Sequence, residues 1–308
     1  GEGLSSWNIL LIIMKKKMFI AFSAVSLFIV GLLIVACSSD TNDLAVVPQT
    51  VKRQAPQDLS SESDWADFYA KVEALNAKYA TQNRSIVLPG IGLHDELTEF
   101  KQLILVADAA GTQLGWEGAT NGINSLTAND IMAMATATGA YSSYIALPNP
   151  DTTIVDTTDI TVTLRDLHTI ADLKVASPCV TMAKRHNQLL GTMMGNNYSS
   201  TGKSQGDILL DFIHGYEQLF GISISNSNES SLVNYVTLAR TPSLTNNVIN
   251  ANHTFQEATI SMSMATMRNY TDEYLGVVAG ASLDAYDKMQ MSIYASVMYY
   301  SNALWIVQ

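Results

Sequence analysis

The sequence predicts an all-α fold, a multi-helix bundle that ends in a long antiparallel helix pair, and three features indicate this class. Apolar residues recur at three- and four-residue spacing through most of the chain after Leu59, which is the period of amphipathic helices. Residues that favour helix starts precede several of these stretches. The alternation typical of a strand appears in one short stretch, residues 160–164.

The first expected helix begins near residues 61–64, where serines and acids favour a helix start. One apolar stripe follows at helical spacing, and it consists of Trp65, Phe68, Tyr69, Val72 and Leu75. The run Leu-Pro-Gly-Ile-Gly at 88–92 breaks this pattern. A second helix is therefore expected over about 95–115.

Residues 104–147 are rich in small side chains, with glycines at helical spacing at Gly111, Gly115, Gly118 and Gly122. Such a segment suits either a hairpin that inserts into a membrane or a tightly packed helix pair in a protein core. The core is favoured, because Asp108, Glu117 and Asp130 interrupt any membrane span. Thr127 and Asp130 have the spacing of a capping box, which predicts a helix over 128–146.

The rest of the chain is expected to be helical as well. The predicted helices cover 178–194, 207–221, 228–239, 242–270 and 271–305, and the first of these starts at Ser177-Pro178. The last two are long and should form the antiparallel pair.

The N-terminal part of the chain has the layout of a secretory signal. Three lysines at 15–17 precede an apolar run over 18–35, and the small residue Ala36 stands before Cys37. A cysteine in this position resembles the lipobox of bacterial lipoproteins. The resemblance implies cleavage before Cys37 and attachment of lipid, palmitate included, to this residue. A single transmembrane anchor is the alternative, since roughly 17–25 apolar residues span a bilayer.

This interpretation divides the chain into four segments. Residues 1–13 are expected to be an upstream artefact, 14–36 a signal peptide, 37–58 a flexible tether and 59–308 a single helical domain. The expected location is the bacterial cell envelope, with the lipid anchor in the outer membrane. A net charge of −11 argues against nucleic acid as a partner, because phosphates require Lys and Arg. No cofactor is expected.

His186 is the most conspicuous polar residue, because it falls in the middle of the apolar face of the helix predicted over 178–194. A core-facing histidine must hydrogen-bond or coordinate something, and Asn187 is the expected partner of a structural His186. A ligand-binding role and catalysis are the alternatives. Cys179 lies in the first helical turn, where the helix dipole favours a thiolate, but about 10 Å of helix separates the two backbones.

A second polar group lies on the helix predicted over 207–221, where Asp207, Asp211 and His214 share one face. Two carboxylates and a histidine at this spacing could hold a divalent metal. A solvated helix face gives the same pattern and is the favoured interpretation, so no metal is expected. The sequence contains no His-Glu-x-x-His, P-loop or Cys-x-x-Cys motif.

The loop predicted over 148–159 contains Asp-Thr-Thr twice. This resembles the short Asp-Thr-X acceptor pattern for O-glycosylation in one group of Gram-negative anaerobes, and it implies Thr152 and Thr157 as acceptors. An ordinary Asx-type turn is the alternative.

Three functions remain open from the sequence. The leading hypothesis is a non-enzymatic envelope lipoprotein that binds a protein or a small molecule. The second is an enzyme built on His186, which predicts a concave pocket around this residue. The third is a membrane-active protein, which predicts an exposed apolar hairpin within 104–147. The exported helical domain with its His-Asn pair resembles uncharacterised lipoproteins of Gram-negative anaerobes, and this resemblance implies no activity for any residue.

Overall fold

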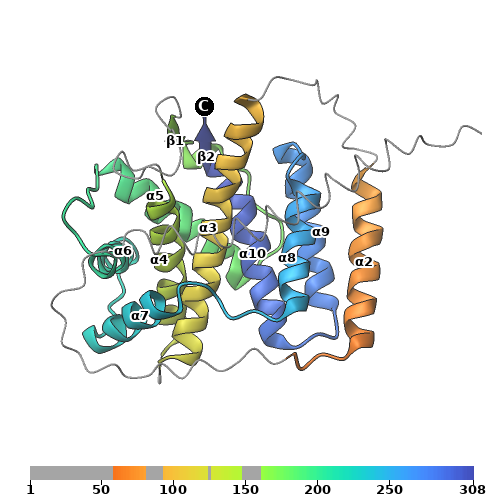
Figure 1. Ribbon diagram of the computed structural model, residues 1–308, viewed down its shortest axis with the longest axis horizontal. Helices are drawn as coiled ribbons and strands as arrows, with labels where there is room; N and C mark the ends of the chain where they lie inside the picture. The colour runs from red at the N-terminus through yellow and green to blue at the C-terminus, as the bar shows by residue number, and fades with distance from the viewer. Residues whose placement is uncertain (1–57, 81–92, 124–125, 148–160) are drawn as a thin grey trace, which may run out of the picture. The chain divides into compact units, whose positions relative to one another are not determined.

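The computed structural model describes residues 58–80, 93–123, 126–147 and 161–308. These residues hold nine α-helices, one short 3-10 helix and a two-stranded sheet, so the predicted all-α multi-helix class is confirmed (Figure 1). The predicted signal peptide, the predicted lipidation residue Cys37 and the predicted glycosylation residues Thr152 and Thr157 lie outside the described residues.

The described elements have the following order along the chain. They are α2 (Glu62–Ala80), α3 (Leu93–Asn121), α4 (Ala128–Ala146), β1 (Val162–Leu164), η1 (Leu167–Thr169), α5 (Pro178–Gly195), α6 (Gln205–Phe220), α7 (Asn226–Ala239), α8 (Asn246–Thr259), α9 (Met264–Gly280), α10 (Ala285–Leu304) and β2 (Trp305–Val307).

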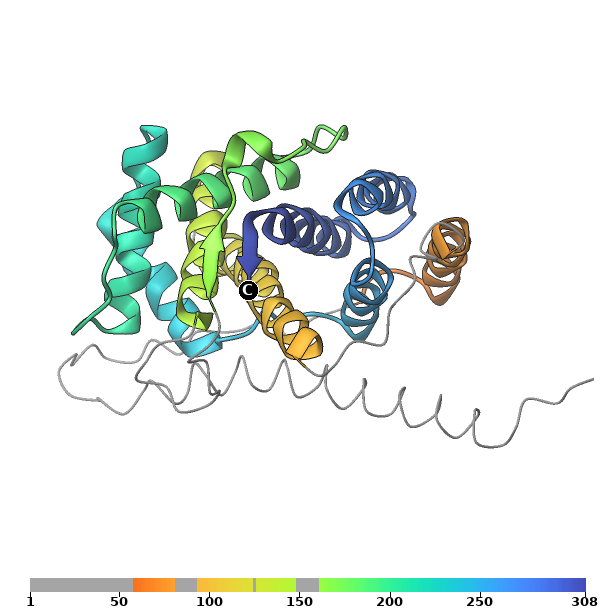
Figure 2. The ribbon, with the colours of Figure 1, turned by 90° about the horizontal axis from the view of Figure 1, so that it is seen from above.

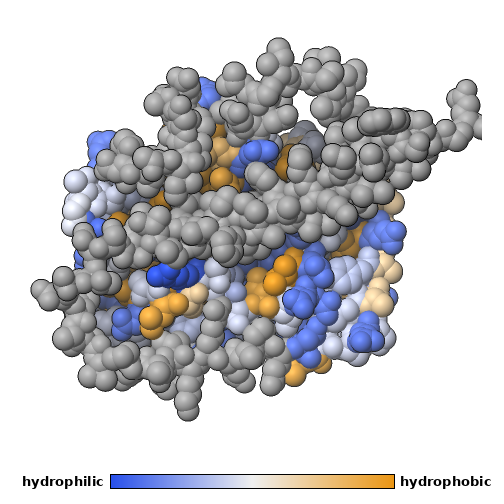
Figure 3. Space-filling model, viewed as in Figure 1, coloured by the Kyte–Doolittle hydropathy of each residue, from blue (hydrophilic) through white to orange (hydrophobic). Residues whose placement is uncertain are grey.

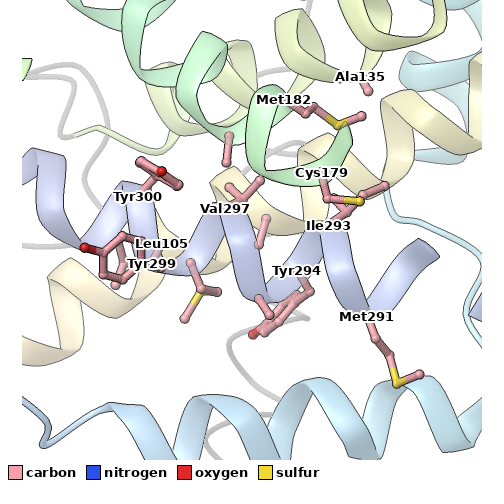
Figure 4. Close-up of a cluster of buried hydrophobic side chains, with 14 of the residues drawn as sticks. Leu105, Ala135, Cys179, Met182, Met291, Ile293, Tyr294, Val297, Tyr299 and Tyr300 are labelled. Atoms are coloured by element: carbon pink, nitrogen blue, oxygen red, sulfur yellow. The ribbon is translucent and has the colours of Figure 1, made fainter. Parts of the chain in front are cut away.

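Helices α3 and α10 lie at the centre of the helical domain. Helix α10 packs against α3 and α5 on one side and against α8 and α9 on the other, as the view from above shows (Figure 2). Its apolar side chains fill the core with those of its neighbours, and Ile293 lies beside Cys179 of α5 (Figure 4). Helix α2 contacts α8 and α9 through the predicted apolar stripe.

The small residues of α3 and α4 bring these two helices into close contact. A Cβ atom added to Gly115 would lie 2.6 Å from Cβ of Thr138 and 2.8 Å from the carbonyl oxygen of Met134 on α4. Gly139 of α4 in turn faces the side chain of Thr112 on α3. Helices α3 and α4 therefore form a tight helix pair in the core, as the favoured interpretation predicts.

The exposed apolar hairpin that a membrane-active protein would need is not seen among the residues that the structure describes. Four large apolar side chains are exposed among the described residues, and they lie in or beside other elements: Leu59, Leu219, Leu238 and Ile249. On the face in Figure 3, the visible hydrophobic residues are interspersed with hydrophilic ones.

Several predicted helix starts are confirmed by their caps. The hydroxyl of Thr127 accepts a hydrogen bond from the backbone N–H of Asp130, whose carboxylate accepts one from the N–H of Thr127. Ser177 caps α5 by accepting from the N–H of Val180, and Pro178 occupies the first turn. These caps satisfy backbone donors that the helix itself leaves free.

The predicted bounds of the C-terminal helices were wrong. Two helices were expected, over 242–270 and 271–305. The structure has three, because the chain turns at 260–263 and again at 281–284. Ser263 caps α9, and Asp284 caps α10. The antiparallel pair at the C-terminus is thus formed by α9 and α10, which a four-residue turn connects.

Of the stretch 160–164 with strand-like alternation, residues 162–164 form the strand β1, and the partner of this strand was not predicted. β1 pairs antiparallel with β2, with Val162 opposite Val307 and Leu164 opposite Trp305. The last helix ends at Leu304, so Trp305 belongs to a strand rather than to the helix in which it was expected.

Candidate functional site

His186 lies inside the protein, where the helical wheel places it. Its side chain is fully buried, and both ring nitrogens have a polar partner. Nδ1 lies 3.1 Å from Oδ1 of Asn187, and Nε2 lies 3.0 Å from Oδ1 of Asp108 on α3. The expected bond to Asn187 is confirmed, and the carboxylate of Asp108 is a partner that the sequence analysis did not identify.

Asp108 joins four elements through its two carboxylate oxygens. Oδ1 faces His186 of α5, while Oδ2 accepts hydrogen bonds from the hydroxyl of Ser301 on α10 and from Nε1 of Trp305 on β2, the latter at 3.0 Å. The Nδ2 amide of Asn187 donates to the carbonyl oxygen of Tyr300 at 2.8 Å. We call Asp108, His186, Asn187, Ser301 and Trp305 the Asp108 network.

The hydrogen bonds define the charge of His186. Because Nδ2 of Asn187 donates to Tyr300, Oδ1 of Asn187 faces the imidazole as an acceptor, and the carboxylate of Asp108 is an acceptor as well. Two acceptors require an imidazolium with both nitrogens protonated. Burial alone would lower the pKa of His186, but the charge and hydrogen bond of Asp108, with the bond to Asn187, raise it above its ordinary value.

The side chains of the Asp108 network are enclosed by the described part of the protein. Each of them is at most 2% exposed. Ser301 also donates to Asp108 and not to His186, so the three residues do not form the nucleophile–base–acid relay of a hydrolase. The pocket that the enzyme hypothesis requires around His186 is absent from the described part of the chain, and the network ties the core together instead.

Cys179 is equally enclosed. Its side chain is 3% exposed, and Sγ lies 3.3 Å from Sδ of Met289. Burial raises the pKa of the Cys179 thiol to about 12, which outweighs the expected effect of the helix dipole. The thiol is therefore protonated at neutral pH and is not poised as a nucleophile.

Two of the three possible metal ligands predicted on α6, Asp207 and Asp211, form hydrogen bonds with neighbouring residues instead. Asp207 accepts from the N–H and hydroxyl of Ser204, so it completes the capping box of α6. Asp211 accepts from the hydroxyl of Tyr198 at 2.6 Å and from Nζ of Lys203 at 2.7 Å. Although burial acts in the opposite direction, these two bonds hold the pKa of Asp211 below its ordinary value.

His214, the third predicted ligand, faces two different carboxylates. One ligand atom each from His214, Glu217 and Glu229 lies within 4.8 Å of the others. Glu217 stands one turn after His214 on α6, and Glu229 comes from the first turn of α7. The spacing of His214 and Glu217 was visible in the sequence, whereas the contact with Glu229 depends on how α6 and α7 pack.

Residues 202–206 read Gly-Lys-Ser-Gln-Gly and match the Gly-x-Ser-x-Gly pattern of the hydrolase nucleophile elbow, a match that the sequence analysis did not identify. That elbow connects a strand to a helix, whereas here a loop precedes α6. The hydroxyl of Ser204 is bonded to Asp207 at 2.7 Å. Ser204 therefore acts as a helix cap.

Two open grooves mark the surface of the described domain. One, of about 410 Å³, lies between α2 and α9, and the other, of about 350 Å³, lies beside the start of α8. The first is lined by Lys71, Leu75, Glu273, Gly276, Val277 and Gly280, and the second by Asp58, Leu244, Thr245, Asn246 and Asn247. Neither groove reaches the Asp108 network, Cys179 or His214.

Among the described residues, no helix has the length and apolar character needed to cross a bilayer. Comparison with known proteins found no matching family model, no similar curated protein and no similar solved structure.

Proposed function

We propose that this chain is a lipid-anchored protein of the bacterial cell envelope. It binds a partner through its surface and is not an enzyme. The observation that carries the proposal is the sequence around Cys37. Three lysines, an apolar run and a small residue precede this cysteine, and serines and Asp40 follow it. Acyl chains on one residue would hold the protein at a membrane, because each buried CH₂ contributes about 0.8 kcal/mol.

The non-catalytic part of the proposal is supported by the closed core. The two residues with the clearest catalytic potential, His186 and Cys179, are at most 3% exposed. Each is engaged inside the core, His186 with Asp108 and Cys179 with Met289. A net charge of −11 and a lipid anchor suit a protein that meets its partners at the membrane.

Lipid attachment is tested by expressing the full chain in a diderm bacterium with an alkyne analogue of palmitate. The chain contains two cysteines, so C37S and C179S form a matched pair. Wild type and C179S should incorporate the label, and C37S should not. Equal labelling of C37S would contradict the proposal.

The binding role is tested by crosslinking in intact cells. The anchored chain should give a crosslinked species of discrete mass, and the same species should persist in H186Q if the Asp108 network is structural and this variant remains folded. If no such species forms, while purified chain hydrolyses or transfers a group in a way that H186Q abolishes, the enzyme hypothesis replaces the binding hypothesis.

A further inference from the structure

Helices α6 and α7 place a histidine and two glutamates around one point of the surface. We propose that His214, Glu217 and Glu229 form a binding site for a divalent transition-metal ion of the Zn²⁺ class. Their ligand atoms lie within 4.8 Å of one another. One imidazole and two carboxylates are ligands that Zn²⁺ accepts, and three protein ligands leave one position for water.

The distance between His214 and Glu229 fits a shared ion better than a direct hydrogen bond. Nε2 of His214 lies 3.3 Å from Oε1 and 3.4 Å from Oε2 of Glu229. A hydrogen bond between such groups is usually shorter, at about 2.7–2.9 Å. Two ligands held at about 2.0–2.1 Å from a tetrahedral ion are about 3.4 Å apart, so this pair already has the spacing of one edge.

The burial of Glu229 is a second and independent observation. Its side chain is 8% exposed, and its carboxylate faces His214, whose side chain is 57% exposed. A buried carboxylate is costly unless charge and hydrogen bonds compensate it, and contacts of 3.3 and 3.4 Å with one exposed imidazole do so poorly. The first turn of α7 favours an acid at this position, but this does not explain why the acid faces both His214 and Glu217.

Glu217 supplies the third ligand and is already oriented. Its Oε1 accepts a hydrogen bond from the backbone N–H of Ile224 at 2.5 Å. Such a bond to a ligating carboxylate restricts its rotation and directs the free oxygen. The negative charges of Glu217 and Glu229 repel each other at this separation, and a divalent cation would neutralise both.

The ligand set also selects the class of ion. Ca²⁺ and Mg²⁺ take six or more oxygen ligands, whereas this group offers one nitrogen and two carboxylates. Imidazole suits Zn²⁺ and its neighbours in the first transition row. The exposed ring of His214 gives the ion a path from solvent.

Calorimetric titration of the full, untagged chain in mild detergent, stripped with EDTA, tests the site with ZnCl₂. Wild type should bind one Zn²⁺ per chain, and E229Q, E217Q and H214N should each bind at least about tenfold more weakly. MgCl₂ and CaCl₂ should give no saturable binding. E257Q is the matched control, since Glu257 and His253 are a His–Glu pair at 3.6 Å with no third ligand in the described residues, and it should bind like wild type.

Thermal unfolding separates the site from a plain ion pair. Zn²⁺ should raise the melting temperature of wild type and E257Q but not of E229Q. Without metal, E229Q should melt no lower than wild type, because an isosteric amide removes a buried charge. If E229Q does not fold, E217Q gives the same test at a half-buried position. Zn²⁺ binding that is absent, that has several weak sites, or that is equal in wild type and the three ligand variants would overturn the proposal.

Discussion

Nε2 of His186 lies 3.0 Å from Oδ1 of Asp108, a residue 78 positions earlier in the chain, and both side chains are fully buried. The pair connects α5 to α3. Through Ser301 and Trp305 it also fixes the end of α10 and the start of β2. An ion pair whose remaining hydrogen-bonding groups are satisfied is tolerated in a core, and it opposes any rearrangement that would separate its members.

Removal of the Asp108 charge should destabilise the protein strongly. In D108N, the amide would leave the His186 imidazolium without a counter-ion and would place N–H donors against Ser301 and Trp305. We expect the free energy of unfolding in urea to fall by roughly 3–5 kcal/mol. H253Q is the control, because the partly exposed pair of His253 and Glu257 should contribute less than about 1 kcal/mol. A loss of that small size in D108N would show that the buried pair is not ionic.

The same pair predicts a pH dependence. The folded-state pKa of His186 is raised above the ordinary 6.5, so its contribution is fully present below about pH 6.5 and is lost as pH rises through the folded pKa. The difference in unfolding free energy between wild type and D108N should therefore shrink on the alkaline side. Urea denaturation at intervals from pH 5 to 9 measures it. A difference that is constant over this range would argue against a protonated His186.

Asp287 presents the opposite case, a buried carboxylate that lacks a counter-charge. The residue is 2% exposed, and Oδ2 has no hydrogen-bond partner among the described residues. Burial, together with the charges of Asp58 and Asp284, raises the pKa of Asp287 to about 6. The folded state thus retains a proton that the unfolded chain releases near its ordinary pKa of 3.8.

Stability should therefore fall as pH rises from about 4 to about 6, because the unfolded chain binds fewer protons than the folded one in this window. D287N removes the effect and should gain roughly 1–3 kcal/mol at pH 7 relative to wild type. The gain should disappear below about pH 4. D67N, at an exposed position, should stay within about 0.5 kcal/mol of wild type at both pH values. A destabilised D287N at pH 7 would contradict the assignment.

The sequence was sufficient for elements whose cause is local. Thr127 with Asp130, and Ser177 with Pro178, are helix starts that a few adjacent residues define, and both were predicted. Helical periodicity also placed His186 toward the core, because the direction of a side chain on a helix depends only on its own helix. The small residues of 104–147 likewise predicted close packing, since a glycine face has little other use in a core.

What the sequence could not give was contact between distant segments. Asp108 was noted only as a charge that interrupts an apolar stretch, although a charge in such a stretch itself indicates a buried partner. Nothing near Asp108 indicates that the partner is His186. Glu229 was missed for the same reason. Trp305 was placed in a helix because its apolar period continues, and only pairing with β1 favours a strand there.

Because α3 packs closely on α4, a single methyl group added at Gly115 should destabilise the folded protein. A Cβ atom there would lie 2.6 Å from the Thr138 side chain and 2.8 Å from the backbone oxygen of Met134, which cannot move aside easily. G115A should lose roughly 1–3 kcal/mol of unfolding free energy in urea. G276A is the matched control, because nothing lies within 4 Å of a Cβ at Gly276 on the exposed face of α9.

G276A should gain about 0.5–1 kcal/mol, since alanine restricts the unfolded chain and favours helix. The opposite signs of the two variants separate packing from propensity. If G115A is as stable as G276A, the two helices are farther apart than this structure places them.

The burial of Cys179 predicts that its thiol reacts very slowly in the folded protein. In C37S, Cys179 is the one remaining cysteine, so any thiol reaction reports on it. The thiol is 3% exposed, and burial raises its pKa to about 12. Only the thiolate reacts with maleimides, so labelling of folded C37S at pH 8 should be at least about a hundredfold slower than in denaturant.

The denatured sample is the internal control, and it should react completely at the rate of a free cysteine. Adding urea in steps should bring the labelling rate up together with the loss of helical circular dichroism, because exposure of Cys179 requires separation of α5 from α10. Fast labelling of the folded chain would instead mean that these two helices open locally. That result would return Cys179 to consideration as a reactive residue.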